Sequence, residues 1–153
     1  MYKKSTEELE NILENIHPSD ISNYVDENQE ELLTEDRSFM KYMNELFKEK
    51  KISKQDVFLK ADISLGYGYK LLAEEKRTQQ RDVILRICYA AEFTLKETQR
   101  ALEIYHMDKL YPRDQRDALI MTFFNEHPSS IIDINEALSS HNMQPLRSSG
   151  VQD

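Results

Sequence analysis

The side chains that could do catalysis or hold a metal ion are four histidines, one cysteine and scattered acids. His17, His106, His127 and His141 lie far apart in the chain and share no metal-ligand spacing with Cys88. No glycine-rich phosphate loop and no nucleophile motif occurs. We therefore expect a chain without cofactor or metal that is not an enzyme, with Cys88 as a small core residue.

The basic side chains are concentrated in the middle of the chain, although the whole carries a net charge of −8. Residues 1–39 carry 3 basic and 11 acidic side chains, whereas residues 40–104 carry 13 basic and 10 acidic ones. Residues 105–153 are acidic again, with 4 basic and 7 acidic side chains. Because counterion release from a nucleic acid is a local effect, only the middle third has the charge to approach phosphates.

Composition favours a helical chain that needs no cross-link. Three glycines and four prolines in 153 residues are too few for the many turns of an all-β fold. No run of 18 apolar residues and no apolar leader occurs, and one cysteine cannot form an intramolecular disulfide. These features predict a cytoplasmic protein that does not span a membrane, and no internal repeat is apparent.

Helical spacing of apolar residues, with capping residues before it, predicts an all-α fold. The expected helix starts lie at Ser5, Ser38, Ser53, Ser64, Thr78, Thr94, Pro112 and Ser130. We divide the chain into an acidic helical extension (1–36), a main domain (37–104), a C-terminal helical pair (105–143) and a flexible tail (144–153). Arg113, Asp114, Arg116 and Asp117 are expected to form a local ion-pair network that fixes the start of the helix after Pro112.

Two short predicted helices, Ser53–Ala61 and Ser64–Glu75, are joined by the three-residue turn Asp62-Ile63-Ser64. This spacing is typical of a helix-turn-helix. In that unit the first helix crosses the phosphate backbone and the second projects one face into the major groove. We therefore expect a surface for double-stranded DNA in this part of the chain.

The sequence from about Phe39 to Leu102 resembles the Xre/lambda-repressor-like helix-turn-helix domain, a compact five-helix DNA-binding fold. The residues that carry the resemblance are Ile52-Ser53-Lys54-Gln55-Asp56-Val57, Tyr67-Gly68-Tyr69-Lys70-Leu71-Leu72, Lys76-Arg77 and Phe93-Thr94-Leu95-Lys96-Glu97-Thr98. The flanks are similar to one bacterial subgroup of these regulators, which has an acidic helical N-terminal extension and a C-terminal Leu-Tyr-Pro-Arg segment. That segment is Leu110–Arg113 here, followed by Arg116-Asp117.

The resemblance implies a transcriptional regulator that binds DNA as a homodimer, through the acidic extension or the C-terminal helices. It implies that base edges meet the second short helix at Ser64, Leu65, Gly66, Tyr69 and Lys70. It places phosphates near Lys54, Lys76, Arg77 and Arg81. Tyr67 and Leu71 are expected to pack inward, and control is expected through a regulatory protein partner.

A second interpretation stays open, because Leu65, Gly66, Tyr69 and Lys70 lack the paired polar groups of Arg, Asn or Gln that match base edges. Glu74 and Glu75 would also repel phosphates. The alternative is a non-catalytic adaptor or antitoxin-like partner that keeps the fold with weak or no DNA binding. Gly68 is expected where the two short helices pack tightly, and Gly66 where DNA approaches.

Overall fold

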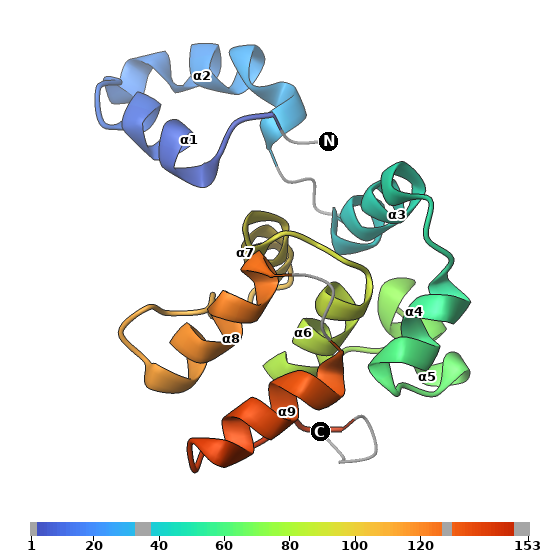
Figure 1. Cartoon of the computed structure of the whole chain (residues 1–153). Coiled ribbons are helices and arrows are strands. Elements are labelled where there is room, and N and C mark those ends of the chain that lie inside the picture. Colours follow the sequence, from blue (N-terminus) through green and yellow to red (C-terminus); the bar gives the residue numbers. More distant parts are fainter. Residues whose placement is uncertain (1–2, 33–37, 127–129, 149–153) are drawn as a thin grey trace. The chain divides into compact units, whose positions relative to one another are not determined.

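The computed structural model describes residues 3–32, 38–126 and 130–148, which form helices, turns and loops without a strand (Figure 1). The all-α prediction is confirmed for this part of the chain. The elements are α1 (Thr6–Leu13), η1 (Pro18–Asp20), α2 (Ile21–Glu27), η2 (Gln29–Glu31), α3 (Ser38–Lys50), α4 (Lys54–Ala61), α5 (Leu65–Leu72), α6 (Arg81–Ala90), α7 (Leu95–Ile104), α8 (Gln115–Asn125) and α9 (Ile131–Ser140). None of these helices is long and apolar enough to cross a membrane.

The chain divides into two compact units, residues 1–38 and 39–153. The first holds α1 to η2, and Ser5 opens α1 with the predicted capping box. The Glu31 carboxylate accepts hydrogen bonds from the backbone amides of Lys3 and Lys4 at 3.0 Å. Tyr24 is the one buried apolar side chain among the described residues of this unit. So small a unit buries little apolar surface of its own.

The core of the second unit surrounds α6, in which nine of ten residues are buried. Helix α4 packs on it from one side, and α7 and α9 pack on it as well (Figure 1). Helix α3 buries its predicted apolar stripe of Phe39, Tyr42, Met43, Leu46 and Phe47. The C-terminal helical pair, which the sequence sets apart from residues 37–104, lies in the same unit.

Among the described residues, six helices end at a left-handed residue that is not glycine. These residues are Lys51, Asp62, Glu74, Glu92, His106 and Asn142, with φ between 56° and 60°. A left-handed residue lets the following amides satisfy the last carbonyls of the helix. The scarcity of glycine is therefore compatible with tightly turned helix ends.

Helices α6–α7 and α8–α9 are two copies of one helical hairpin, contrary to our sequence-based finding of no repeat. Gln80-Arg81-Asp82 recurs 35 residues later as Gln115-Arg116-Asp117. The segment 94–111 aligns with 130–147 at a shift of 36 residues, with an Ala-Leu pair, a methionine and a later leucine at equivalent positions. Both second helices begin with a capping box, at Thr94 and at Ser130. Leu110 and Leu146 are both buried, at the same place in each copy.

The loop after each hairpin is held by the same type of bond. The side-chain oxygen of Gln99 accepts a hydrogen bond from the Leu110 amide at 2.8 Å. The side-chain oxygen of Asn135, 36 residues later, accepts one from the Leu146 amide at the same distance. The two copies thus share their loop geometry, although most of their side chains differ.

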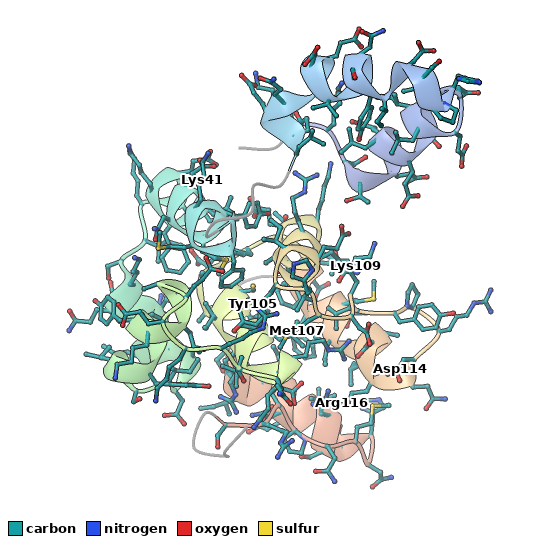
Figure 2. All side chains as sticks on the ribbon, turned by 180° about the vertical axis from the view of Figure 1, so that it is seen from behind. Lys41, Tyr105, Met107, Lys109, Asp114 and Arg116 are labelled. Atoms are coloured by element: carbon teal, nitrogen blue, oxygen red, sulfur yellow. The ribbon has the colours of Figure 1, made fainter. Side chains whose placement is uncertain are left out.

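Crossed ion pairs join the two copies. Arg81 of the first copy donates to Asp117 of the second at 3.0 Å, and Arg116 of the second donates to Asp82 of the first at 2.9 Å. Exchanging the copies exchanges these pairs, which is the pattern of a two-fold relation that closes on itself. The expected ion-pair network within 113–117 is therefore corrected, since Arg116 (labelled in Figure 2) and Asp117 pair with Asp82 and Arg81 of α6.

The prediction of a flexible tail is wrong for residues 144–148. Leu146 is 3% exposed, and its carbonyl accepts a hydrogen bond from buried Arg86 at 2.8 Å. Arg86 also donates to the carbonyls of Arg147 at 2.8 Å and Ala61 at 3.1 Å. This arginine therefore ties the end of α4 to the C-terminal segment. Residues 149–153 lie outside the described part of the chain.

Candidate nucleic-acid interface

The turn between α4 and α5 has the predicted three residues. Ser53 caps α4, since its hydroxyl accepts a hydrogen bond from the Asp56 amide at 3.1 Å. Asp62 ends α4 with φ at 57°. Buried Ile63 then donates its amide to the Phe58 carbonyl at 2.9 Å. The left-handed Asp62 and the buried Ile63 reverse the chain so that α5 packs back on α4.

Gly68 fixes how closely α5 approaches α4. A Cβ atom at Gly68 would lie 2.6 Å from Cδ1 of Phe58, closer than any side chain tolerates. Tyr69 packs its ring edge to face with Phe58, with centroids 5.2 Å apart. The inward side of α5 is thus locked on one aromatic ring, as expected for Gly68 and for buried Leu71.

The opposite side of α5 faces solvent. A Cβ atom at Gly66 would meet nothing within 4 Å. Leu65 is 37% exposed, and Tyr69, at the border between the two sides, is 45% exposed although its ring contacts Phe58. The five predicted base-contacting residues all lie at the exposed surface: Ser64, Leu65, Gly66, Tyr69 and Lys70. Ser64 precedes α5 but does not cap it with its side chain, so that expectation is corrected.

Helix α5 ends at Leu72, three residues earlier than predicted. Glu74 is the left-handed residue that stops it, and its carboxylate lies 3.4 Å from the Met40 amide at the start of α3. One of the two acids expected to repel phosphates is therefore turned toward α3. Glu75 remains exposed.

The predicted phosphate-binding residues fall into two groups. Lys54 lies in the first turn of α4, and exposed Lys76 lies over the Tyr67 ring at 6.0 Å. Arg77 stacks on the Tyr105 ring at 4.1 Å and donates a hydrogen bond to the Tyr105 carbonyl. Tyr67 itself is half-buried. Lys54 is half-buried, whereas Lys76 and Arg77 are both exposed, but the Arg77 guanidinium is engaged by Tyr105.

Arg81 belongs to the second group, because its guanidinium is engaged inside the protein. It pairs with Asp117, whose side chain is 6% exposed, and donates to the Lys109 carbonyl at 3.3 Å. The structure thus places Arg81 in the joint between the two hairpins, where it acts as a positioning residue. It does not lie with the exposed lysines.

Positioning residues that the sequence analysis missed are Asp82, Arg86 and Gln99. Burial lowers the pKa of the Arg86 guanidinium from its ordinary value, and the charges of Asp62 and Asp82 oppose that shift. The repeated Gln-Arg-Asp triplet was the available signal for Asp82. No comparable signal marked Arg86, since its partners are carbonyls about 25 and 60 residues away.

Cys88 is completely buried in α6. Burial raises the pKa of its thiol far above the ordinary value, which a hydrogen bond with Thr98 opposes and the charge of Glu97 reinforces. Such a thiol stays protonated and is a poor nucleophile. Within the described ranges, no three His, Cys, Asp or Glu side chains gather in a way that could hold a metal ion.

Comparison with known proteins gives no match. No protein-family model fits the chain, and no curated protein or solved structure is significantly similar to it. What the chain does is therefore inferred from its own residues and their geometry.

Proposed function

We propose that this chain is a DNA-binding transcriptional regulator that places the outer face of α5 in a major groove. The observation that carries the proposal is that one side of α5 is packed on α4 and the other is exposed to solvent. One side is locked to Phe58 through Gly68, while Ser64, Leu65 and Lys70 lie exposed on the other. A rigidly braced helix with a free face is what groove insertion requires.

In this proposal α3 to α7 form the five-helix domain of Xre/lambda-repressor type that the sequence resembles. Helix α4 is then the supporting helix and α5 the recognition helix. The remaining hairpin, α8–α9, is fixed to that domain by the crossed ion pairs of Arg81 and Arg116. A fixed domain holds the two short helices in one orientation and reduces the entropy lost on binding.

Local charge supports the proposal. Residues 51–77 carry 6 basic and 4 acidic side chains, in a chain whose net charge is −8. Lys54, Lys70 and Lys76 are the cations that can reach phosphates, and such contacts set affinity and register without reading sequence. Arg77 and Arg81 contribute less to this set, because both have partners within the protein.

Base reading by this face would rely mainly on shape and apolar contact. Gly66 allows close approach, Leu65 can touch a thymine methyl group, and Lys70 can donate to guanine. Such a face gives modest sequence discrimination, so a two-fold pair of units is needed for a specific operator. We propose that the chain binds DNA as a homodimer and catalyses no reaction. We also propose that a protein partner regulates it.

The test measures binding to mixed genomic DNA fragments by fluorescence anisotropy. The variant Lys54→Glu/Lys70→Glu/Lys76→Glu should lose at least tenfold in affinity, because three phosphate contacts become repulsive. The single variant Lys96→Glu, at an exposed position of α7, should bind like the unsubstituted chain. Equal loss in both variants, or no binding by the unsubstituted chain at low salt, would contradict the proposal.

A protein-interaction adaptor is the second candidate, favoured by the exposure of Leu65 and Tyr69. Exposed apolar side chains on a short helix also suit a protein partner. Selection of bound fragments from a random DNA pool separates the two functions. An enriched sequence supports the regulator, whereas a pool that stays random after repeated selection supports the adaptor.

A further inference from the structure

The repeat exposes a difference between α6 and α8. The two helices align with a shift of 35 residues, so Tyr89 corresponds to Phe124. These two rings pack against each other edge to face, with centroids 5.2 Å apart. Helices α6 and α8 therefore contact each other through side chains that hold equivalent positions in the two hairpins. We call these sides of the two helices their inner sides.

The outer sides of the two helices differ in burial. On α6 the outer positions hold Val83, Ile84, Ile87 and Cys88, each at most 1% exposed. The corresponding positions on α8 hold Ala118, Leu119, Thr122 and Phe123, which we call the α8 face. Thr122 is exposed and the other three are only half-buried.

The cause of this difference is the packing of α4. Helix α4 packs on α6, and the Ala61 carbonyl at its end accepts a hydrogen bond from Arg86. Helix α6 lies between α4 and α8 in both views (Figures 1 and 2). Within the described residues of the second unit, α8 packs mainly against α7 and α9, and no helix there takes the place on α8 that α4 takes on α6.

The α8 face carries no charge. The charged residues of α8 are Arg116 and Asp117, and both pair with the first hairpin. The eight residues that follow, 118–125, are Ala-Leu-Ile-Met-Thr-Phe-Phe-Asn. A helix with apolar residues on all sides is normally covered on more than one side.

We propose that the α8 face is the interface between two copies of this chain. In a two-fold pair each residue near the axis meets its own equivalent, so the centre of such a face has to be free of charge, whereas charges away from the axis can pair with opposite ones. The α8 face meets this condition in a chain of which 31% is charged. This interface would join the two copies of the homodimer named under the proposed function. It is inferred from the repeat and does not depend on DNA binding.

The exposed apolar residues of the first unit suit self-association less well. Leu13, Ile21 and Val25 are 40–48% exposed in the first unit. Residues 3–32 of that unit carry 2 basic and 9 acidic side chains, which would meet like charges in a two-fold pair. This contrast selects α8 over the acidic extension as the site of pairing.

The α8 face is small, since a helix of 11 residues is about 16 Å long. One helix pair buries less surface than a standard stable interface. We therefore expect a weak, concentration-dependent dimer, with a dissociation constant on the order of micromolar or above.

The test is sedimentation of the full chain without DNA over a range of concentrations. Thr122→Glu and Thr122→Arg each place a charge on the α8 face at an exposed position that leaves the core intact. Each variant alone should weaken dimerisation at least tenfold. An equimolar mixture of the two should restore it, because opposite charges then meet. Leu13→Glu is the matched control and should dimerise like the unsubstituted chain.

A chain that stays monomeric at all concentrations would overturn the proposal, and so would a dimer that Leu13→Glu disrupts and Thr122→Glu does not. Failure of the mixture to restore the dimer would show that Thr122 does not meet its equivalent in the partner copy, and would overturn the proposed pairing as well. A dimer that behaves as expected but binds no DNA would contradict the proposed function alone. The two proposals therefore fail separately.

Discussion

The ring of Phe58 occupies the space that a side chain at Gly68 would fill, with Cδ1 2.6 Å from the Cβ position. Helices α4 and α5 therefore approach each other at a distance that glycine alone allows. Gly66, two residues earlier on the same helix, has open space at its Cβ position. The two glycines of α5 thus have opposite surroundings.

Gly68→Ala should destabilise the protein by about 1 to 3 kcal/mol, because the added methyl group forces Phe58 out of its position. Gly66→Ala is the matched control and should be neutral or stabilising by up to about 1 kcal/mol, since alanine favours the helix. Urea unfolding followed by circular dichroism measures both. Equal stability of the two variants would show that α5 does not pack on α4 in this way.

Arg81→Met and Arg116→Met should lower the free energy of unfolding by similar amounts, about 2 to 4 kcal/mol each. Each change leaves a largely buried carboxylate, Asp117 or Asp82, without its guanidinium partner. Thermal or urea unfolding measures the loss. A large effect of one substitution with none of the other would contradict the equivalence of the hairpins.

Arg86→Met should release the segment 144–148, because three carbonyls lose their donor. We expect a loss of about 2 to 4 kcal/mol in stability. Trypsin should then cut after Arg147 faster than in the unsubstituted chain. Cleavage after Arg113, in an exposed loop, should keep its rate and serves as the internal control. An unchanged rate after Arg147 would mean that Arg86 does not hold this segment.

Cys88 should make stability depend on pH in the alkaline range. Burial raises the pKa of its thiol in the folded chain, so the unfolded chain releases the proton first. The free energy of unfolding should therefore fall as the pH rises above about 8.5, by up to about 1.4 kcal/mol per pH unit. Urea unfolding of the Cys88→Ala variant at each pH should lack this part of the slope. Identical slopes for both chains would rule the contribution out.

Local features of the fold could be predicted from the sequence. The caps at Ser5, Ser53, Thr94 and Ser130 were predicted, because each bond joins residues three apart. The turn at 62–64 was predicted for the same reason. The end of α5 was not, because it depends on a left-handed Glu74 in a place where glycine is usual.

Features that depend on distant residues could not be predicted. The repeat was missed because its shift changes from 35 to 36 residues between the first and second helix of the hairpin. The segment 144–148 is polar except for Leu146, and its docking depends on Arg86 about 60 residues earlier. Of the candidate site, the exposed face of α5 follows from helical spacing. The pairing of Arg81 with Asp117 follows only from how the hairpins pack.

The most direct test of DNA binding through α5 is the salt dependence of affinity. For the unsubstituted chain, the logarithm of the association constant should fall linearly with the logarithm of salt concentration. Lys76→Gln, just after α5, should make that slope shallower by about 0.9, the loss of one phosphate contact, while Lys96→Gln should leave it unchanged. Affinity that does not respond to salt, or equal slopes for the two variants, would contradict the account.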